Sequence, residues 1–142
     1  MFLGEYEYKI DPKGRVPLPS KFREELRRGM VMAQGLEKCI TVYPLSEWQR
    51  MSEERAISAP ARSKARRMSR FTFASAFSVE LDAQGRVALP SPLRQYAEIG
   101  DVVVIAGINN YIEIWSKENW GVERDLMQSQ AWQISESTEE RY

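Results

Sequence analysis

The sequence predicts an α+β fold, mainly β, in which two copies of one small unit pack with pseudo-twofold symmetry into one small barrel, plus linking helices. Three observations carry this prediction. The chain contains an internal repeat, it shows the apolar–polar alternation of half-buried strands, and each repeated unit spans only about 45 residues. A unit of that size cannot easily bury both faces of a sheet alone, so two units sharing one core are expected.

The repeat is clearest in one 13-residue segment. Residues 11–23 (DPKGRVPLPSKFR) recur as residues 82–94 (DAQGRVALPSPLR), with eight identical positions. Similarity continues as far as the equivalent tryptophans Trp48 and Trp120. We therefore divide the chain into a first unit (residues 5–47), a helical basic linker (48–75), a second unit (76–119) and an acidic C-terminal tail (120–142).

Each unit is expected to begin with a hairpin. Tyr6, Tyr8 and Ile10 alternate with polar residues, as in a strand with one buried face. The following Asp-x-x-Gly-Arg segment favours a turn, because Asp bonds nearby backbone and Gly tolerates a positive φ. A short strand at residues 16–18 then completes the hairpin, and the flanking prolines keep it short or at an edge.

The rest of each unit reads as one brief helix and two strands. Ser20 and Ser91 stand where an N-cap is expected, with Pro92 at the first helical position. The helices should end near Gly29 and Gly100. Strands are expected at residues 30–33 and 36–43, and at 102–106 and 108–115. In the linker we expect helices at 46–56 and 61–70, separated by a break around 58–60, with Pro60 at a helix start.

Composition narrows the function classes. The chain has no histidine, the usual general base and commonest metal ligand, so an ordinary hydrolase or metalloenzyme is disfavoured. The single cysteine, Cys39, cannot form an internal disulfide, which fits a reducing cytoplasm. No apolar run approaches the ~20 residues of a membrane span, and the acidic start does not resemble a signal peptide. We expect no cofactor, no metal and no small-molecule substrate.

The net charge of zero hides a polarised distribution. Residues 49–70 carry seven basic and two acidic side chains, whereas residues 71–115 carry two basic and five acidic ones. Such a chain can bind a polyanion through one surface. The basic stretch 62–70 either contacts phosphates or pairs with acidic residues of a neighbouring subunit, and its scattered spacing favours the second interpretation.

The two polar turns are the candidate functional site. Arginine is well shaped to grip the edge of guanine or a phosphate with two hydrogen bonds, and each turn carries one directly after its glycine. The alternative is that each Asp–Arg pair is only a structural ion pair that holds its turn together (a turn staple) and binds nothing. The candidate DNA-binding residues are Asp11, Lys13, Gly14, Arg15, Asp82, Gly85 and Arg86.

The aromatic residues and the cysteine have structural interpretations. Tyr43, Trp48, Trp115 and Trp120 end equivalent strands, and core or interface packing explains them better than base stacking. Cys39 aligns with a tyrosine in the second unit, so its position does not demand a thiol.

The opening FLGEY, the two Asp-x-x-Gly-Arg turns running into Val-x-Leu-Pro, and the linking basic helix together resemble the MraZ family, within the AbrB-like (SpoVT-AbrB) bacterial transcription factors. The resemblance extends to about Trp120. It implies two AbrB-like ββαββ units and a regulator of the division and cell-wall gene cluster, nucleoid-associated in the cytoplasm. It also implies a homo-oligomeric ring whose loops face direct repeats in promoter double-stranded DNA. The second loop has Gln84 at the position of Lys13 in the first, which implies that the two loops contribute unequally to DNA binding.

Two other function classes remain open. AbrB-like folds also occur in antitoxins, so the turns could belong to a protein-interaction module that binds a partner protein. The doubled unit argues against this alternative, while the short acidic tail leaves it open. An enzyme is the third class, which the absence of histidine and of a metal-ligand cluster disfavours.

Overall fold

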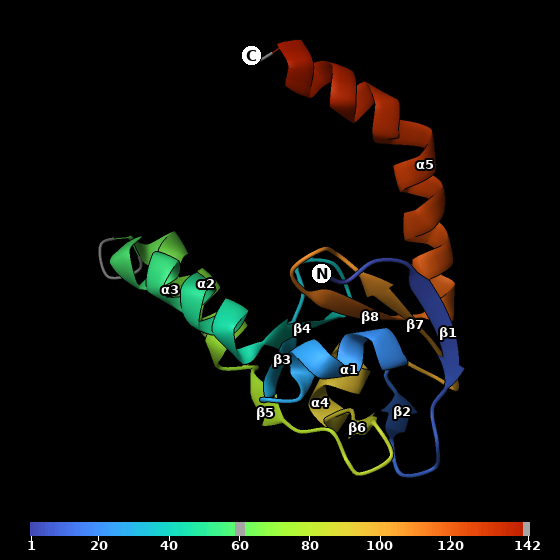
Figure 1. Ribbon diagram of the computed structural model, residues 1–142. Coiled ribbons are helices and arrows are strands. Elements are labelled where there is room, and N and C mark those ends of the chain that lie inside the picture. The colour runs from blue at the N-terminus through green and yellow to red at the C-terminus, as the bar shows by residue number, and fades with distance from the viewer. Residues whose placement is uncertain (59–61, 141–142) are drawn as a thin grey trace.

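The computed structural model describes the backbone of residues 1–58 and 62–140 and contains the same five elements twice (Figure 1). Unit 1 consists of β1 (Glu5–Lys9), β2 (Arg15–Pro17), α1 (Ser20–Leu26), β3 (Met30–Gln34) and β4 (Ile40–Pro44). Unit 2 consists of β5 (Phe77–Val79), β6 (Arg86–Ala88), α4 (Ser91–Tyr96), β7 (Val102–Gly107) and β8 (Ile112–Ser116). The helices α2 (Leu45–Ser58) and α3 (Ser63–Phe73) link the units, and α5 (Lys117–Glu140) follows them. The predicted α+β class with two repeated units is confirmed, and the body outside α2, α3 and α5 is mainly β.

The strands interlock across the two units. A six-stranded antiparallel sheet has the order β1-β7-β8-β4-β3-β5, and β2 pairs with β6 in a separate two-stranded sheet. The first strand of each unit therefore pairs with the third strand of the other unit. Val16 pairs with Val87 and Thr41 with Glu113, each opposite its own equivalent in the repeat, so the pseudo-twofold axis passes through both sheets.

The expected hairpin within each unit is wrong. β1 pairs with β7 and β2 with β6, while β1 and β2 share only the turn between them, closed by the Asp11 N–H donating to the Arg15 carbonyl (2.9 Å). The physical reason is that apolar–polar alternation shows which face of a strand is buried but does not identify its partner strand. β2 and β6, the second strands of the two units, instead form a short ladder with each other.

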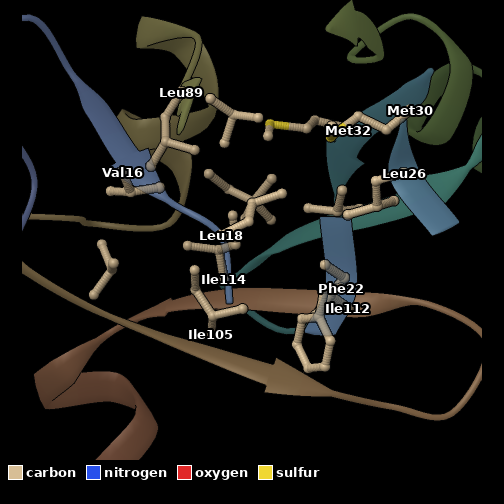
Figure 2. Close-up of a cluster of buried hydrophobic side chains, with 14 of the residues drawn as sticks. Val16, Leu18, Phe22, Leu26, Met30, Met32, Leu89, Ile105, Ile112 and Ile114 are labelled. Carbon is tan, nitrogen blue, oxygen red and sulfur yellow. The ribbon is translucent and has the colours of Figure 1, made fainter. Parts of the chain in front are cut away.

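The six-stranded sheet and the two-stranded sheet enclose one shared core. Figure 2 shows Leu18 beside Ile105 and Ile114 of the large sheet, and Val16 near Leu89, all within one buried cluster. Both units contribute buried side chains to this one cluster, among them the equivalent pairs Val16 and Val87, and Leu18 and Leu89. The largest fully buried side chains are Phe2, Phe22, Leu18, Leu26, Met30, Met32, Ile40, Leu93, Ile105, Ile112, Ile114 and Val16.

Several predicted element ends need correction. Ser20 and Ser91 are the first helical residues and not N-caps: Pro19 and Pro90 precede them, and neither helix has a side-chain cap hydrogen bond. An extended proline already orients the chain for the first turn, so no cap is needed to start these short helices. The helices end at Leu26 and Tyr96, a few residues before the two glycines.

The last strand of each unit starts later than expected. β4 begins at Ile40 and β8 at Ile112, because residues 36–39 and 108–111 form tight turns. The Gly35 N–H donates to the Cys39 carbonyl (2.9 Å), and the Ile108 N–H donates to the Tyr111 carbonyl (2.8 Å). The two linker helices are present as α2 and α3. Of the expected break around 58–60, Ser58 is the last residue of α2, and Pro60 lies outside the described residues.

The helices outside the units project from the body. In Figure 1, α2 and α3 extend together from one side and α5 rises from another, while both Asp-x-x-x-Arg loops lie side by side at the bottom of the body. Trp120 anchors the start of α5 on the sheet, and every described side chain from 124 to 136 is exposed. No described helix is long and apolar enough to cross a membrane.

Candidate functional site

The two Asp-x-x-x-Arg loops have nearly identical backbones. Gly14 and Gly85 adopt φ values of 77° and 76°, in the left-handed region that glycine occupies most readily. In each loop the glycine N–H donates to the aspartate carbonyl, at 2.9 Å for Gly14 and 3.0 Å for Gly85. The predicted glycine turns are therefore present at both positions.

One carboxylate organises each loop. Asp11 Oδ1 accepts hydrogen bonds from the N–H groups of Lys13 (2.9 Å) and Arg15 (2.8 Å), and Asp11 Oδ2 accepts one from Arg15 Nε (2.6 Å). Asp82 makes the same three contacts with Gln84 and Arg86, all at 2.9 Å. The Asp–Arg pairs thus do staple their turns, and this role also fixes the direction of each arginine.

These contacts perturb both carboxylates. The backbone N–H of Arg15, followed by its guanidinium, holds the pKa of Asp11 below its ordinary value despite some desolvation. The backbone N–H and guanidinium of Arg86 lower the pKa of Asp82 in the same way. Both carboxylates are therefore ionised at neutral pH and act as fixed hydrogen-bond acceptors.

The loops of the two units are held against each other. The Leu18 N–H donates to the Gly85 carbonyl (3.0 Å), and the Leu89 N–H donates to the Gly14 carbonyl (2.8 Å). Arg86 Nη1 lies 4.0 Å from Asp11 Oδ2, so the two ion pairs approach one another. The arginine side chains are about 30% exposed, at 31% for Arg15 and 30% for Arg86. The ribbon of β2 and β6 therefore presents both arginines on one surface.

A second pair of arginines lies beneath the loops, and the sequence analysis did not assign it to the site. Arg23 Nε donates to the Leu18 carbonyl and Arg94 Nε donates to the Leu89 carbonyl, both at 3.0 Å. A Cβ added to Gly85 would lie 2.5 Å from Arg23 Cζ, and one added to Gly14 would lie 3.1 Å from Arg94 Cζ. Each guanidinium therefore packs under the loop of the opposite unit, as the identical last residue of the 13-residue repeat could have indicated.

The surroundings of the two loops differ. Beside the second loop, a hollow of about 470 Å³ is lined by Arg23, Arg27 and Arg28 from unit 1 and by residues 80–85 of unit 2. At offset 71, Arg27 and Arg28 correspond to Glu98 and Ile99. The repeat therefore conserves the loop itself but not the charges around it.

The other sequence candidates lie away from these loops. The described cations of α3 and its N-cap are exposed, and α3 projects to a different side of the body from the loops (Figure 1). Tyr43 packs edge-on against Trp48, with ring centroids 5.7 Å apart, and Trp115 packs against Trp120 at the same distance. This packing agrees with the structural interpretation of the aromatic residues.

The remaining titratable groups form no metal site within the described residues, where no cluster of three or more His, Cys, Asp or Glu side chains is placed to hold an ion. Cys39 is fully buried, and burial raises the pKa of its thiol well above the ordinary value. Burial also raises the pKa of Glu113, to which Trp115 Nε1 donates a hydrogen bond (3.1 Å). Cys39 belongs to the second, smaller apolar cluster, and Glu113 is half-buried and bonded to Trp115 of that cluster.

Comparisons with known proteins match nearly the whole chain. A family model described as "MraZ protein, putative antitoxin-like" matches residues 1–71 and again residues 72–141. A protein of Dehalococcoides mccartyi strain BAV1, named transcriptional regulator MraZ, is 52% identical over 141 residues, covering 99% of both chains. Proteins with the same name from Halothermothrix orenii and Thermomicrobium roseum are 48% identical (85% of both chains) and 38% identical (96% of both chains).

Proposed function

The chain belongs to the MraZ family, and we propose that it regulates transcription by binding double-stranded DNA through the paired loops at residues 11–15 and 82–86. The observation that carries the proposal is the fixed direction of Arg15 and Arg86. Each aspartate engages Nε, so the terminal amino groups of the guanidinium remain at the outer end of the side chain. A planar guanidinium held in this way is suited to a bidentate contact with a guanine edge or a phosphate.

The stapling of the turns and the proposed DNA contact are compatible. An arginine side chain loses considerable rotamer entropy when it is immobilised on a ligand. The Asp–Arg pair incurs much of that loss during folding, which pre-organises the arginine before DNA arrives. Glycines at 14 and 85 support the same purpose, because they let the loop backbone turn tightly over the arginine beneath it.

We further propose that the DNA target consists of direct repeats in the promoter of the division and cell-wall gene cluster, bound by a homo-oligomeric ring. One loop pair neutralises only a few phosphates, which gives weak affinity. Several pairs held in one assembly increase affinity by avidity, by ~10²–10⁴. The apolar side chains exposed along α5, unusual on a monomer, are consistent with self-association. They are Val122, Leu126, Met127, Trp132 and Ile134.

The test is a fluorescence anisotropy titration of a duplex from the region upstream of the chain's own gene. We expect Arg15→Ala/Arg86→Ala to bind this duplex about a hundredfold more weakly or worse, since a bidentate base contact contributes about 1–3 kcal/mol. Arg15→Lys/Arg86→Lys keeps the charge and loses the planar fork, so it should retain non-specific binding and lose discrimination between the promoter and a random duplex.

The matched control is Arg50→Ala/Arg124→Ala, which removes two exposed cations from α2 and α5. It should bind like the wild type, and light scattering should give the same mass for all variants. Equal binding by the wild type and Arg15→Ala/Arg86→Ala would reduce the arginines to turn staples and make α3 the next candidate. If the wild type itself binds no DNA, the antitoxin-type alternative of a partner protein takes precedence.

A further inference from the structure

The interlocked fold brings cations of unit 1 to the loop of unit 2. Arg23, Arg27 and Arg28 lie on or directly after α1, yet they line the same hollow as Asp82 and Gln84 of the second loop. The contact between Arg23 and Gly85 fixes this arrangement, since the guanidinium lies directly beneath the glycine. The hollow is therefore a joint surface of α1 and the second loop.

The charges in the hollow leave a positive surplus. Of its two acidic side chains, Asp82 is already paired with Arg86 (2.9 Å), which leaves Glu80 against three arginines. Arg27 pairs with Glu24 at 3.1 Å, but both side chains are more than two-thirds exposed, and such pairs contribute little. Arg28 is exposed and forms no hydrogen bond or ion pair with any other described residue. Two arginines thus remain available to an external anion.

The surplus of positive charge in the hollow lies beside the loop that carries less positive charge of its own. The second loop has Gln84 where the first has Lys13, and the residue two positions before each loop differs in the same sense, Glu80 against Lys9. Around the first loop, the equivalents of Arg27 and Arg28 are Glu98 and Ile99, and Glu98 pairs with Lys38 (2.6 Å). Each loop region therefore has additional cations: the first loop carries Lys13 itself, and the second loop borders Arg27 and Arg28, which follow α1 of unit 1.

We propose that Arg27 and Arg28 form a phosphate-binding site beside the second loop and contact the DNA backbone next to Arg86. This inference rests on the proposed function, and it specifies the site of a contact that the Asp-x-x-x-Arg motif does not include. Arg23 is a positioning residue in this arrangement: its Nε is anchored on the Leu18 carbonyl, and it holds the loop at its height above α1. Phosphate contacts set register and orientation without reading sequence, so α1 adds affinity and not discrimination.

The experiment is a salt titration of DNA affinity with Arg27→Ala/Arg28→Ala, the wild type and the control Arg50→Ala/Arg124→Ala. Each variant is titrated against the promoter duplex and a random duplex. The slope of log K against log salt should become shallower by about 1–2 in Arg27→Ala/Arg28→Ala (the α1 variant), since each lost phosphate contact removes about 0.9. Affinity should fall by the same factor for both duplexes, and the control should keep the wild-type slope.

The outcomes separate this inference from the proposed function. If the wild type binds DNA and the α1 variant has the slope and affinity of the control, the phosphate site is refuted and loop-mediated binding stands. If the α1 variant loses discrimination between the duplexes, the arginines read bases and the proposed phosphate role is wrong. If the wild type binds neither duplex, both proposals fail. Circular dichroism melting of the α1 variant, expected to match the wild type because both side chains are exposed, excludes misfolding as the cause.

Discussion

The two Asp-x-x-x-Arg loops share one internal construction and stand in two different environments. Inside each loop, the glycine φ, the three aspartate contacts and the turn hydrogen bonds agree closely. Outside, the first loop lies over Arg94 and carries its own Lys13, whereas the second lies over Arg23 and borders Arg27 and Arg28, the two arginines that follow α1. The duplication thus preserves what orients an arginine, while the surrounding charge has diverged.

This difference shows which features of the loop are under geometric constraint. The aspartate must accept two N–H groups and one guanidinium, so neither its charge nor its length can vary. The residue two positions later donates only its backbone N–H to that aspartate, and either Lys or Gln can do so. Charge at that position is therefore free to move to another element, and α1 of the opposite unit is the nearest one available to the second loop.

The largest expected effect is a loss of folding stability when either loop glycine is replaced, and it should differ between the loops because different arginines pack beneath them. Gly14→Ala and Gly85→Ala should each destabilise the fold by about 1–2 kcal/mol, because alanine is strained at positive φ. Gly85→Ala should cost about 1 kcal/mol more, since its Cβ would displace Arg23 and break that side chain's hydrogen bond to Leu18. Urea unfolding at one fixed protein concentration measures both values.

The matched control for these variants is Gly100→Ala, where no atom lies within 4 Å of the added Cβ and φ is not positive. Its free energy of unfolding should stay close to the wild-type value or rise slightly. Equal losses of unfolding free energy for Gly14→Ala and Gly85→Ala would mean that Arg23 moves away without cost. The close contact between Arg23 and Gly85 would then contribute nothing to stability.

The next effect concerns pH and should be similar for both loops. The folded-state pKa values of Asp11 and Asp82 are lowered, so their contribution to stability is complete above the ordinary aspartate pKa and is lost as pH falls through the folded values. Asp11→Asn/Asp82→Asn should lack this contribution. The difference in unfolding free energy between wild type and variant should therefore be largest near neutral pH and shrink in acid. A difference that does not change with pH would show that the carboxylate charge is irrelevant to the loops.

Local patterns in the sequence predicted the loops well. Asp11, Gly14 and Arg15 interact within five residues, so the motif alone contains the geometry of the turn. The repeat then predicted the same turn at residues 82–86 and the order of elements in both units. These features depend on near neighbours in the chain, which is why no knowledge of the tertiary fold was needed.

The interlocking of the units could not be predicted in this way. The alternation of Tyr6, Tyr8 and Ile10 shows that one face of β1 is buried, but a period of two does not identify the partner strand. Pairing β1 with β2 satisfied the same pattern as the observed pairing with β7. The positions of Arg23 and Arg94 follow from that exchange of strands between the units. The repeat shows an arginine at both positions but not the loop of the opposite unit that lies above each one.

The smallest expected effect tests the comparison directly by exchanging the residues that differ. Lys13→Gln should make the salt slope of DNA binding shallower by about 0.9, and Gln84→Lys should make it steeper by at most about 0.9. Neither change alters an aspartate contact, because residues 13 and 84 donate through the backbone. The same anisotropy titrations measure both slopes.

The two substitutions should change the salt slope by different amounts if Arg27 and Arg28 already contact phosphates beside the second loop. When Gln84→Lys is the only change, the new ammonium competes with Arg27 and Arg28 for the same phosphates. The slope increase caused by Gln84→Lys should then be smaller than the decrease caused by Lys13→Gln. In an Arg27→Ala/Arg28→Ala background the competition disappears, and Gln84→Lys should regain its full increment. If Gln84→Lys changes the salt slope equally in both backgrounds, the new ammonium and the guanidinium groups of Arg27 and Arg28 contact different phosphates. Arg27 and Arg28 would then add phosphate contacts of their own and would not substitute for a lysine in the second loop.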